Sequence, residues 1–222
     1  HTAIVARSMD IPAVVGARQA SNLIRQDDCI IIDGDAGLVI VDPSPIVLEE
    51  YRFRQRQSEL ERSRLARLRH TPAVTLDGER VELVANIEMP EDAPVALEAG
   101  AVGVGLFRSE FLFMNRGGHL PDEEEQYDAY RRAVEAMKGL PVTIRTIDIG
   151  ADKPLERMTP SELRQESVLN PALGLRAIRW SLSEPSMFRR QLRALLRAAV
   201  HGPVKVMIPM LSNLREIRQT LE

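Results

Sequence analysis

Val102-Gly-Val-Gly-Leu-Phe-Arg108 is the stretch that decides the fold prediction for this chain of 222 residues. It is an apolar run without alternation, which is typical of a strand buried on both faces, as in a parallel sheet. A second run of this kind, Pro141-Val-Thr-Ile-Arg145, also ends in an arginine. Ligands of parallel α/β proteins bind at the carboxyl ends of the strands. The two guanidinium groups therefore predict a site for a small ligand bearing phosphate or carboxylate.

The region from residue 81 onward alternates regularly between strand and helix patterns. Strands are predicted at 81–87, 102–108, 141–148 and 204–210, and helices at 90–100, 122–139, 170–180, 184–200 and from 213 onward. Successive strand–helix units predict parallel strands with right-handed crossovers. An open doubly wound sheet and a (β/α)8 barrel both fit this pattern. Residues 81–89 contain no glycine, which argues against a dinucleotide fingerprint, and four units are half of a TIM-type barrel.

The first part of the chain has a different character. Residues 29–33 and 38–42 predict two strands joined by a tight turn, at one end of a small domain that spans residues 1–45. Pro43-Ser-Pro45 is predicted to interrupt the pattern, and the charged residues 46–72 predict a helical linker, helical from about Val47 to His70. We interpret its arginines as a solvated face. Residues 73–222 then form the α/β domain.

Composition excludes several classes of protein. The net charge of −3 shows no basic excess of the kind that nucleic-acid binding requires, and no apolar run approaches the length of a membrane span. Cys29 is the single cysteine, so no internal disulfide is possible, and its apolar neighbours predict a buried, inert thiol. A cytoplasmic protein is expected. Because the sequence starts at His1 and stops within a helical pattern, we expect an internal fragment of a longer protein.

Polar residues cluster after the predicted strands. The candidates for chemistry at this edge are Asn86, Arg108, Ser109, Glu110, Arg145, Asp148, Asp152 and Lys153. Each arginine has an alternative role, which is to pair with a structural carboxylate such as Glu110 or Asp148, but two arginines at one edge favour ligand binding. Asp148 and Asp152 without a third ligand are a poor metal motif, so no metal site is predicted within this chain.

Four segments resemble motifs of the phosphoenolpyruvate-utilising enzymes, in the expected order and over essentially the whole chain. His1–Gly16 resembles their phosphohistidine signature, and Gly105–Arg116 resembles their substrate-domain motif, which Thr143–Lys153 and Asn170–Arg179 continue. The residue Thr2 and the run Phe-Leu-Phe-Met after Arg-Ser-Glu are more similar to the branch that serves the sugar phosphotransferase system than to the dikinases and synthases.

The resemblance implies a fold and a function. The fold would be the end of a phosphohistidine swivelling domain, a connecting helix and the first half of a (β/α)8 phosphoenolpyruvate-binding barrel. His1 would take the phosphoryl group of phosphoenolpyruvate and pass it to the carrier protein HPr, in the first step of sugar uptake. Arg108 and Arg145 would hold the phosphate, and Arg176 would be a further arginine of that site, placed in a helix after a long loop.

The same resemblance implies what the chain lacks and what the whole protein needs. Mg²⁺ would be the cofactor, held by residues beyond Glu222, and the whole protein would be a homodimer without nucleic-acid or membrane partners. The fragment alone is expected to be inactive. Alternatives that remain open are a dikinase or synthase that takes phosphate from ATP, a regulatory homologue of the nitrogen type, and a catalytically silent half-barrel used for association.

Overall fold

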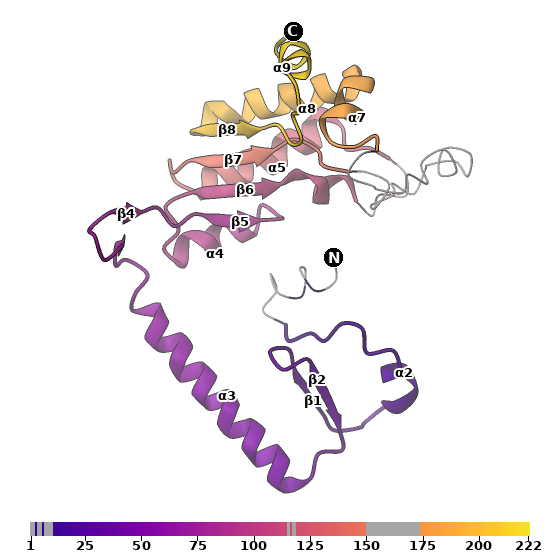
Figure 1. Ribbon diagram of the computed structural model, residues 1–222, viewed down its shortest axis with the longest axis vertical. Coiled ribbons are helices and arrows are strands. Elements are labelled where there is room, and N and C mark those ends of the chain that lie inside the picture. The colour runs from indigo at the N-terminus through magenta and orange to yellow at the C-terminus, as the bar shows by residue number, and fades with distance from the viewer. Residues whose placement is uncertain (1–2, 4–5, 7–10, 115, 117–118, 150–173) are drawn as a thin grey trace. The chain divides into compact units, whose positions relative to one another are not determined.

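The computed structural model describes residues 3, 6, 11–114, 116, 119–149 and 174–222. The chain divides into two compact units, His1–Leu68 and Arg69–Glu222 (Figure 1). Each unit has its own sheet structure, and the second contains the parallel sheet.

The first unit contains the predicted hairpin and a short helix, α2 (Ala20–Leu23). Strands β1 (Ile30–Asp33) and β2 (Leu38–Val41) pair in antiparallel register. The prediction of a buried thiol at Cys29 is wrong, because this side chain is exposed. The physical reason is that β1 and β2 pair with each other alone among the described residues, so the side chains of this small sheet are only half-buried or exposed.

Helix α3 (Pro45–Ala66) is 22 residues long, or about 33 Å. It begins where an interruption was predicted, because proline suits the first helical position, which needs no N–H partner. The Ser44 hydroxyl caps this end by accepting the backbone N–H of Val47 at 3.4 Å. The helix ends before His70, so the predicted end was too late. None of its residues is buried, which confirms the solvated face.

The second unit opens with a hairpin that was not predicted from the sequence. Strands β3 (Ala73–Val74) and β4 (Arg80–Val81) pair antiparallel, and the predicted strand 81–87 is therefore split. A four-stranded parallel sheet follows in the chain order β5-β6-β7-β8, as predicted. Its strands are β5 (Ala85–Ile87), β6 (Val104–Arg108), β7 (Val142–Arg145) and β8 (Val204–Met207).

Helices α4, α5 and α8 lie along one face of this sheet (Figure 1). Among its described residues, the unit contains the helices α4 (Asp92–Glu98), α5 (Glu123–Ala136), α7 (Ile178–Ser183), α8 (Pro185–Ala198) and α9 (Leu214–Leu221). Asp122 caps α5 in a capping box with Glu125, which fixes where the helix begins.

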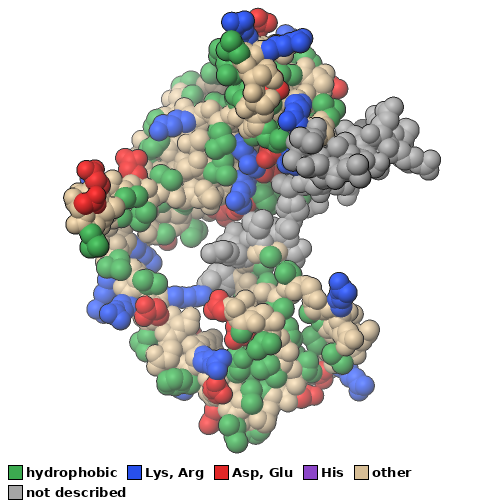
Figure 2. Space-filling model, in the orientation of Figure 1, with side chains coloured by type: hydrophobic (Ala, Val, Ile, Leu, Met, Phe, Trp, Pro, Cys, Tyr) green, Lys and Arg blue, Asp and Glu red, His purple; other side chains and the backbone are tan. Residues whose placement is uncertain are grey.

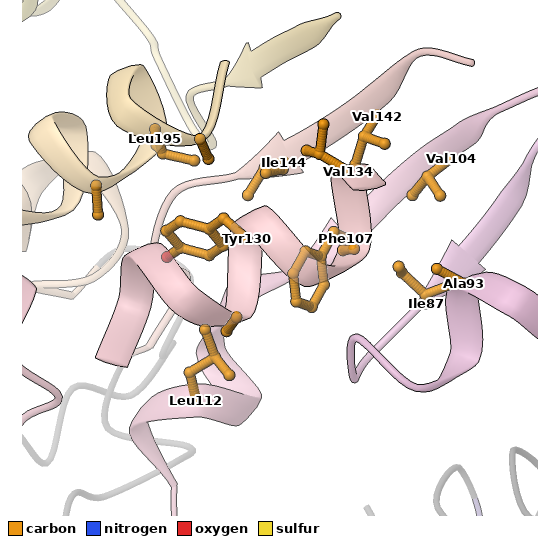
Figure 3. Packing of buried hydrophobic residues seen from close by; sticks show 14 of the residues in the cluster. Ile87, Ala93, Val104, Phe107, Leu112, Tyr130, Val134, Val142, Ile144 and Leu195 are labelled. Carbon is orange, nitrogen blue, oxygen red and sulfur yellow. The ribbon is translucent and has the colours of Figure 1, made fainter. Parts of the chain in front are cut away.

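The core lies between the sheet and these helices (Figure 3). Phe107, Val142 and Ile144 project from the strands into it and are fully buried. The ring of Phe107 meets the ring of Tyr130 on α5 edge to face, with 5.9 Å between the centroids. Because side chains alternate along a strand, residues next to Phe107 and Ile144 project from the opposite face of the sheet.

Candidate functional site

Arg108 and Arg145 are direct partners across the ladder between β6 and β7. Each is the last residue of its strand. Each also follows a core residue, Phe107 or Ile144, so its side chain projects from the sheet face opposite α4, α5 and α8. The two guanidinium groups therefore start from one level of the carboxyl edge, as the sequence predicted.

Carboxylates surround the two arginines. Arg108 forms an ion pair with Glu88, which follows β5. Arg145 pairs with Glu110 and, at 3.2 Å, with Asp148. The alternative role weighed for Arg145, pairing with Glu110 or Asp148, is thus present in the structure. Glu88 was missed, and its only sequence signal is its position directly after a predicted strand.

Asp148 links Arg145 to the third predicted arginine. Its Oδ2 lies 3.2 Å from Nη1 of Arg145, and its Oδ1 lies 3.0 Å from Nη2 of Arg176. Arg176 precedes α7 rather than lying inside a helix, which corrects the expected placement. It nevertheless reaches the same edge of the sheet, where it shares Asp148 with Arg145. Arg108 has a carboxylate partner of its own, Glu88.

A buried amide fixes the backbone behind the arginines. Gln191 of α8 donates from Nε2 to the Ser109 hydroxyl at 3.1 Å and to the Tyr130 hydroxyl at 3.0 Å. Its Oε1 accepts the backbone N–H of Ile147 at 3.1 Å. One side chain therefore connects the segment after Arg108 with the segment after Arg145. Burial raises the pKa of Tyr130 to about 12, so its hydroxyl stays protonated.

Electrostatics at the edge are balanced rather than purely basic. Burial raises the pKa of Glu88, against the opposing attraction of Arg108, and the nearby carboxylates of Asp92 and Glu110 add to the rise. Acidic and basic side chains are interspersed on the face of the molecule shown in Figure 2. An anionic ligand would therefore compete with carboxylates that belong to the protein.

The other predicted residues have mixed outcomes. Asn86 is exposed on β5, and Ser109 and Glu110 are buried in the 3₁₀ turn that follows β6. His1, Asp152 and Lys153 lie outside the described residues. Within the described part of the chain, no three histidine, cysteine or acidic side chains group as metal ligands, and no helix is both long and apolar enough to cross a bilayer.

Comparison with known proteins decides the family. Residues 62–222 match the model described as PEP-utilising enzyme, PEP-binding domain, and residues 1–37 match PEP-utilising enzyme, mobile domain. The chain belongs to the phosphoenolpyruvate-utilising enzymes. The matched domains occur in the predicted order, and the three strand-edge arginines all fall within the PEP-binding domain of this family.

Relatives among the phosphoenolpyruvate-utilising enzymes match 98–100% of the chain. A phosphoenolpyruvate-protein phosphotransferase of Cupriavidus necator is 71% identical over 221 residues, which is 100% of this chain. Proteins of the same name from Geobacillus stearothermophilus and Staphylococcus carnosus are 48% and 46% identical over 99% and 98% of the chain. The chain spans about 37% of the length of each of these relatives.

Proposed function

We propose that this chain is part of a phosphoenolpyruvate–protein phosphotransferase, enzyme I of the sugar phosphotransferase system. Phosphoenolpyruvate binds at the carboxyl edge of the sheet, its phosphoryl group moves to His1, and HPr then receives it. The observation that carries this proposal is the register pairing of Arg108 with Arg145, to which Asp148 joins Arg176.

The fold supports an assignment of three parts of the chain to separate roles. Residues 1–45 are the end of the phosphohistidine domain, residues 46–72 are a helical connector, and residues 73–222 are the first half of a (β/α)8 barrel. Four parallel strands in chain order, with helices along one face, are consistent with half of such a barrel. The whole protein acts in the cytoplasm as a homodimer.

The chemistry follows from the charges of these residues. The bond between phosphorus and the enol oxygen breaks as a bond forms between phosphorus and a ring nitrogen of His1, and enolpyruvate leaves. A neutral imidazole supplies the attacking lone pair. The arginines neutralise the negative charge of the transferring oxygens without titrating, because guanidinium remains protonated.

Magnesium, which the family implies, does not fit the described residues. The three carboxylates of the arginine cluster, Glu88, Glu110 and Asp148, are each engaged in an ion pair with an arginine. A Mg²⁺ ion needs oxygen ligands with near-octahedral geometry, and the described residues include no group of three side chains that could hold a metal ion. The proposed phosphoryl transfer therefore does not use a metal ion bound by Glu88, Glu110 or Asp148.

Phosphate-labelled phosphoenolpyruvate tests the proposal in the product of the complete gene. We expect acid-labile label on the protein that HPr removes, lost in His1→Ala and retained in His70→Ala, a matched change at an exposed histidine. The 222-residue chain alone should remain unlabelled. Labelling from ATP would instead indicate a dikinase or synthase, and labelling without transfer to HPr would indicate a regulatory branch.

A further inference from the structure

Glu88 occupies an unusual position for a carboxylate. Ile87, the last residue of β5, pairs with Phe107 of β6, so Glu88 lies one step further along, level with Arg108. Arg108 is in turn level with Arg145. Three neighbouring strands thus bring a glutamate and two arginines to the same level of the carboxyl edge, and the glutamate has the same sign of charge as the proposed ligand.

The backbone around Glu88 is fixed by the next helix. The Asp92 carboxylate at the start of α4 accepts the N–H groups of Glu88 and Met89 at 3.0 and 2.9 Å. The Glu88 side chain is 11% exposed and pairs with Nη1 of Arg108. The fixed backbone and the burial of the side chain therefore hold the Glu88 carboxylate against Arg108.

Arg108 has a limited number of donors to share. A guanidinium binds phosphate best through two parallel N–H bonds, and one of its terminal nitrogens already donates to Glu88. The negative charge of Glu88 also repels an incoming phosphate. Among the described residues, the charged groups that act on Glu88 are the carboxylates of Asp92 and Glu110 and the guanidinium of Arg108.

We propose that Glu88 competes with the ligand phosphate for Arg108, and takes up a proton from solvent when the phosphate binds. This inference rests on the proposed function, in which Arg108 holds the phosphate of phosphoenolpyruvate. The protonated carboxyl then donates a hydrogen bond to a phosphate oxygen instead of repelling it. Glu88 thereby limits the affinity of the site and makes it depend on pH.

Calorimetric titration of the complete protein with phosphoenolpyruvate tests this inference. Glu88→Gln should bind roughly three- to tenfold more tightly than the wild type near neutral pH, because a competing charge is removed and the shape is kept. Repeating the titration in buffers of different ionisation enthalpy should show less proton uptake in the variant. Any protons that the phosphate of the ligand takes up or releases contribute equally to the wild type and the variant, so they cancel in the difference.

Glu91→Gln is the matched control, since Glu91 is an exposed acid of the same segment that pairs with Arg132. It should bind like the wild type. Unchanged or weaker binding by Glu88→Gln, or unchanged proton uptake, would overturn the role of Glu88. The proposed function fails separately, if the wild type does not bind phosphoenolpyruvate or if Arg108→Gln binds it equally well.

Discussion

Gln191 accepts the backbone N–H of Ile147, two residues beyond Arg145, while its amide nitrogen donates to Ser109, the residue after Arg108. A leucine at position 191 keeps the volume but leaves the buried N–H of Ile147 without this acceptor. We expect Gln191→Leu to lower the free energy of unfolding by about 2–4 kcal/mol.

Urea unfolding of the 222-residue chain, followed by the fluorescence of Trp180, measures this loss. Gln219→Leu changes an exposed glutamine of α9 and should alter stability by less than about 0.5 kcal/mol. A loss at position 191 as small as that of the control would show that the buried amide contributes no net stability.

Arg145→Lys tests the ligand site itself. A lysine keeps the charge but has a single nitrogen, whereas Arg145 pairs with Glu110 through Nη2 and with Asp148 through Nη1. It also cannot donate two parallel bonds to one phosphate. We expect phosphoenolpyruvate to bind about 10- to 100-fold more weakly to the complete protein. Arg132→Lys, a change in an exposed ion pair, should bind normally, and equal affinity of both variants would remove Arg145 from the site.

The hydroxyl of Tyr130 should lose its proton at a higher pH than an ordinary tyrosine. Its pKa of about 12 in the folded chain lies above the ordinary value of 10.0 because the hydroxyl is buried. Between these values the unfolded chain has lost a proton that the folded chain retains, so stability falls as pH rises. Ultraviolet titration of the three tyrosines should show one late step that is absent from Tyr130→Phe, and the variant should lose stability less steeply across this range. Three ordinary titrations would contradict the assignment.

Arg197 joins α8 to the start of α5. It donates to both oxygens of Glu124 at 2.6 and 2.9 Å and to Glu123 at 3.0 Å. Hydrogen bonds from Arg193 and Arg197 lower the pKa of Glu123, and that from Arg197 lowers the pKa of Glu124.

Stability from these pairs is therefore present above the ordinary glutamate pKa and is lost as pH falls through the lowered values. In Arg197→Met, the thermal midpoint should fall less steeply than in the wild type as the pH is lowered. Added salt should reduce the difference in thermal midpoint between the variant and the wild type. Arg189→Met, at an exposed position of the same helix, should leave the acid side unchanged. An equal effect of both variants would assign the loss to general charge.

Local chemistry explains which elements the sequence predicted. The acidic start of α5 and the apolar runs before Arg108 and Arg145 are signals within a few residues, and the structure has a helix and two strands there. The hairpin formed by β3 and β4 also carried a local signal, Asp77-Gly78, which is typical of tight turns.

Pairings between residues that are distant in the sequence could not be predicted in the same way. The contact of Glu88 with Arg108 depends on the register between two strands, and that of Arg176 with Asp148 depends on where a chain segment returns to the sheet. The exposure of Cys29 depends on how many layers cover its strand. These three relationships are set by tertiary structure, and local sequence patterns of this chain specify none of them.

The order of the sheet also has a consequence for how the protein is made. Each strand from β6 to β8 pairs with the strand that precedes it in the chain, so each can dock as it leaves the ribosome. Gln191 is synthesised 46 residues after Arg145, by the difference of their numbers. We therefore expect the two arginine-bearing strands to be in place early in synthesis but to reach their final spacing only when α8 emerges.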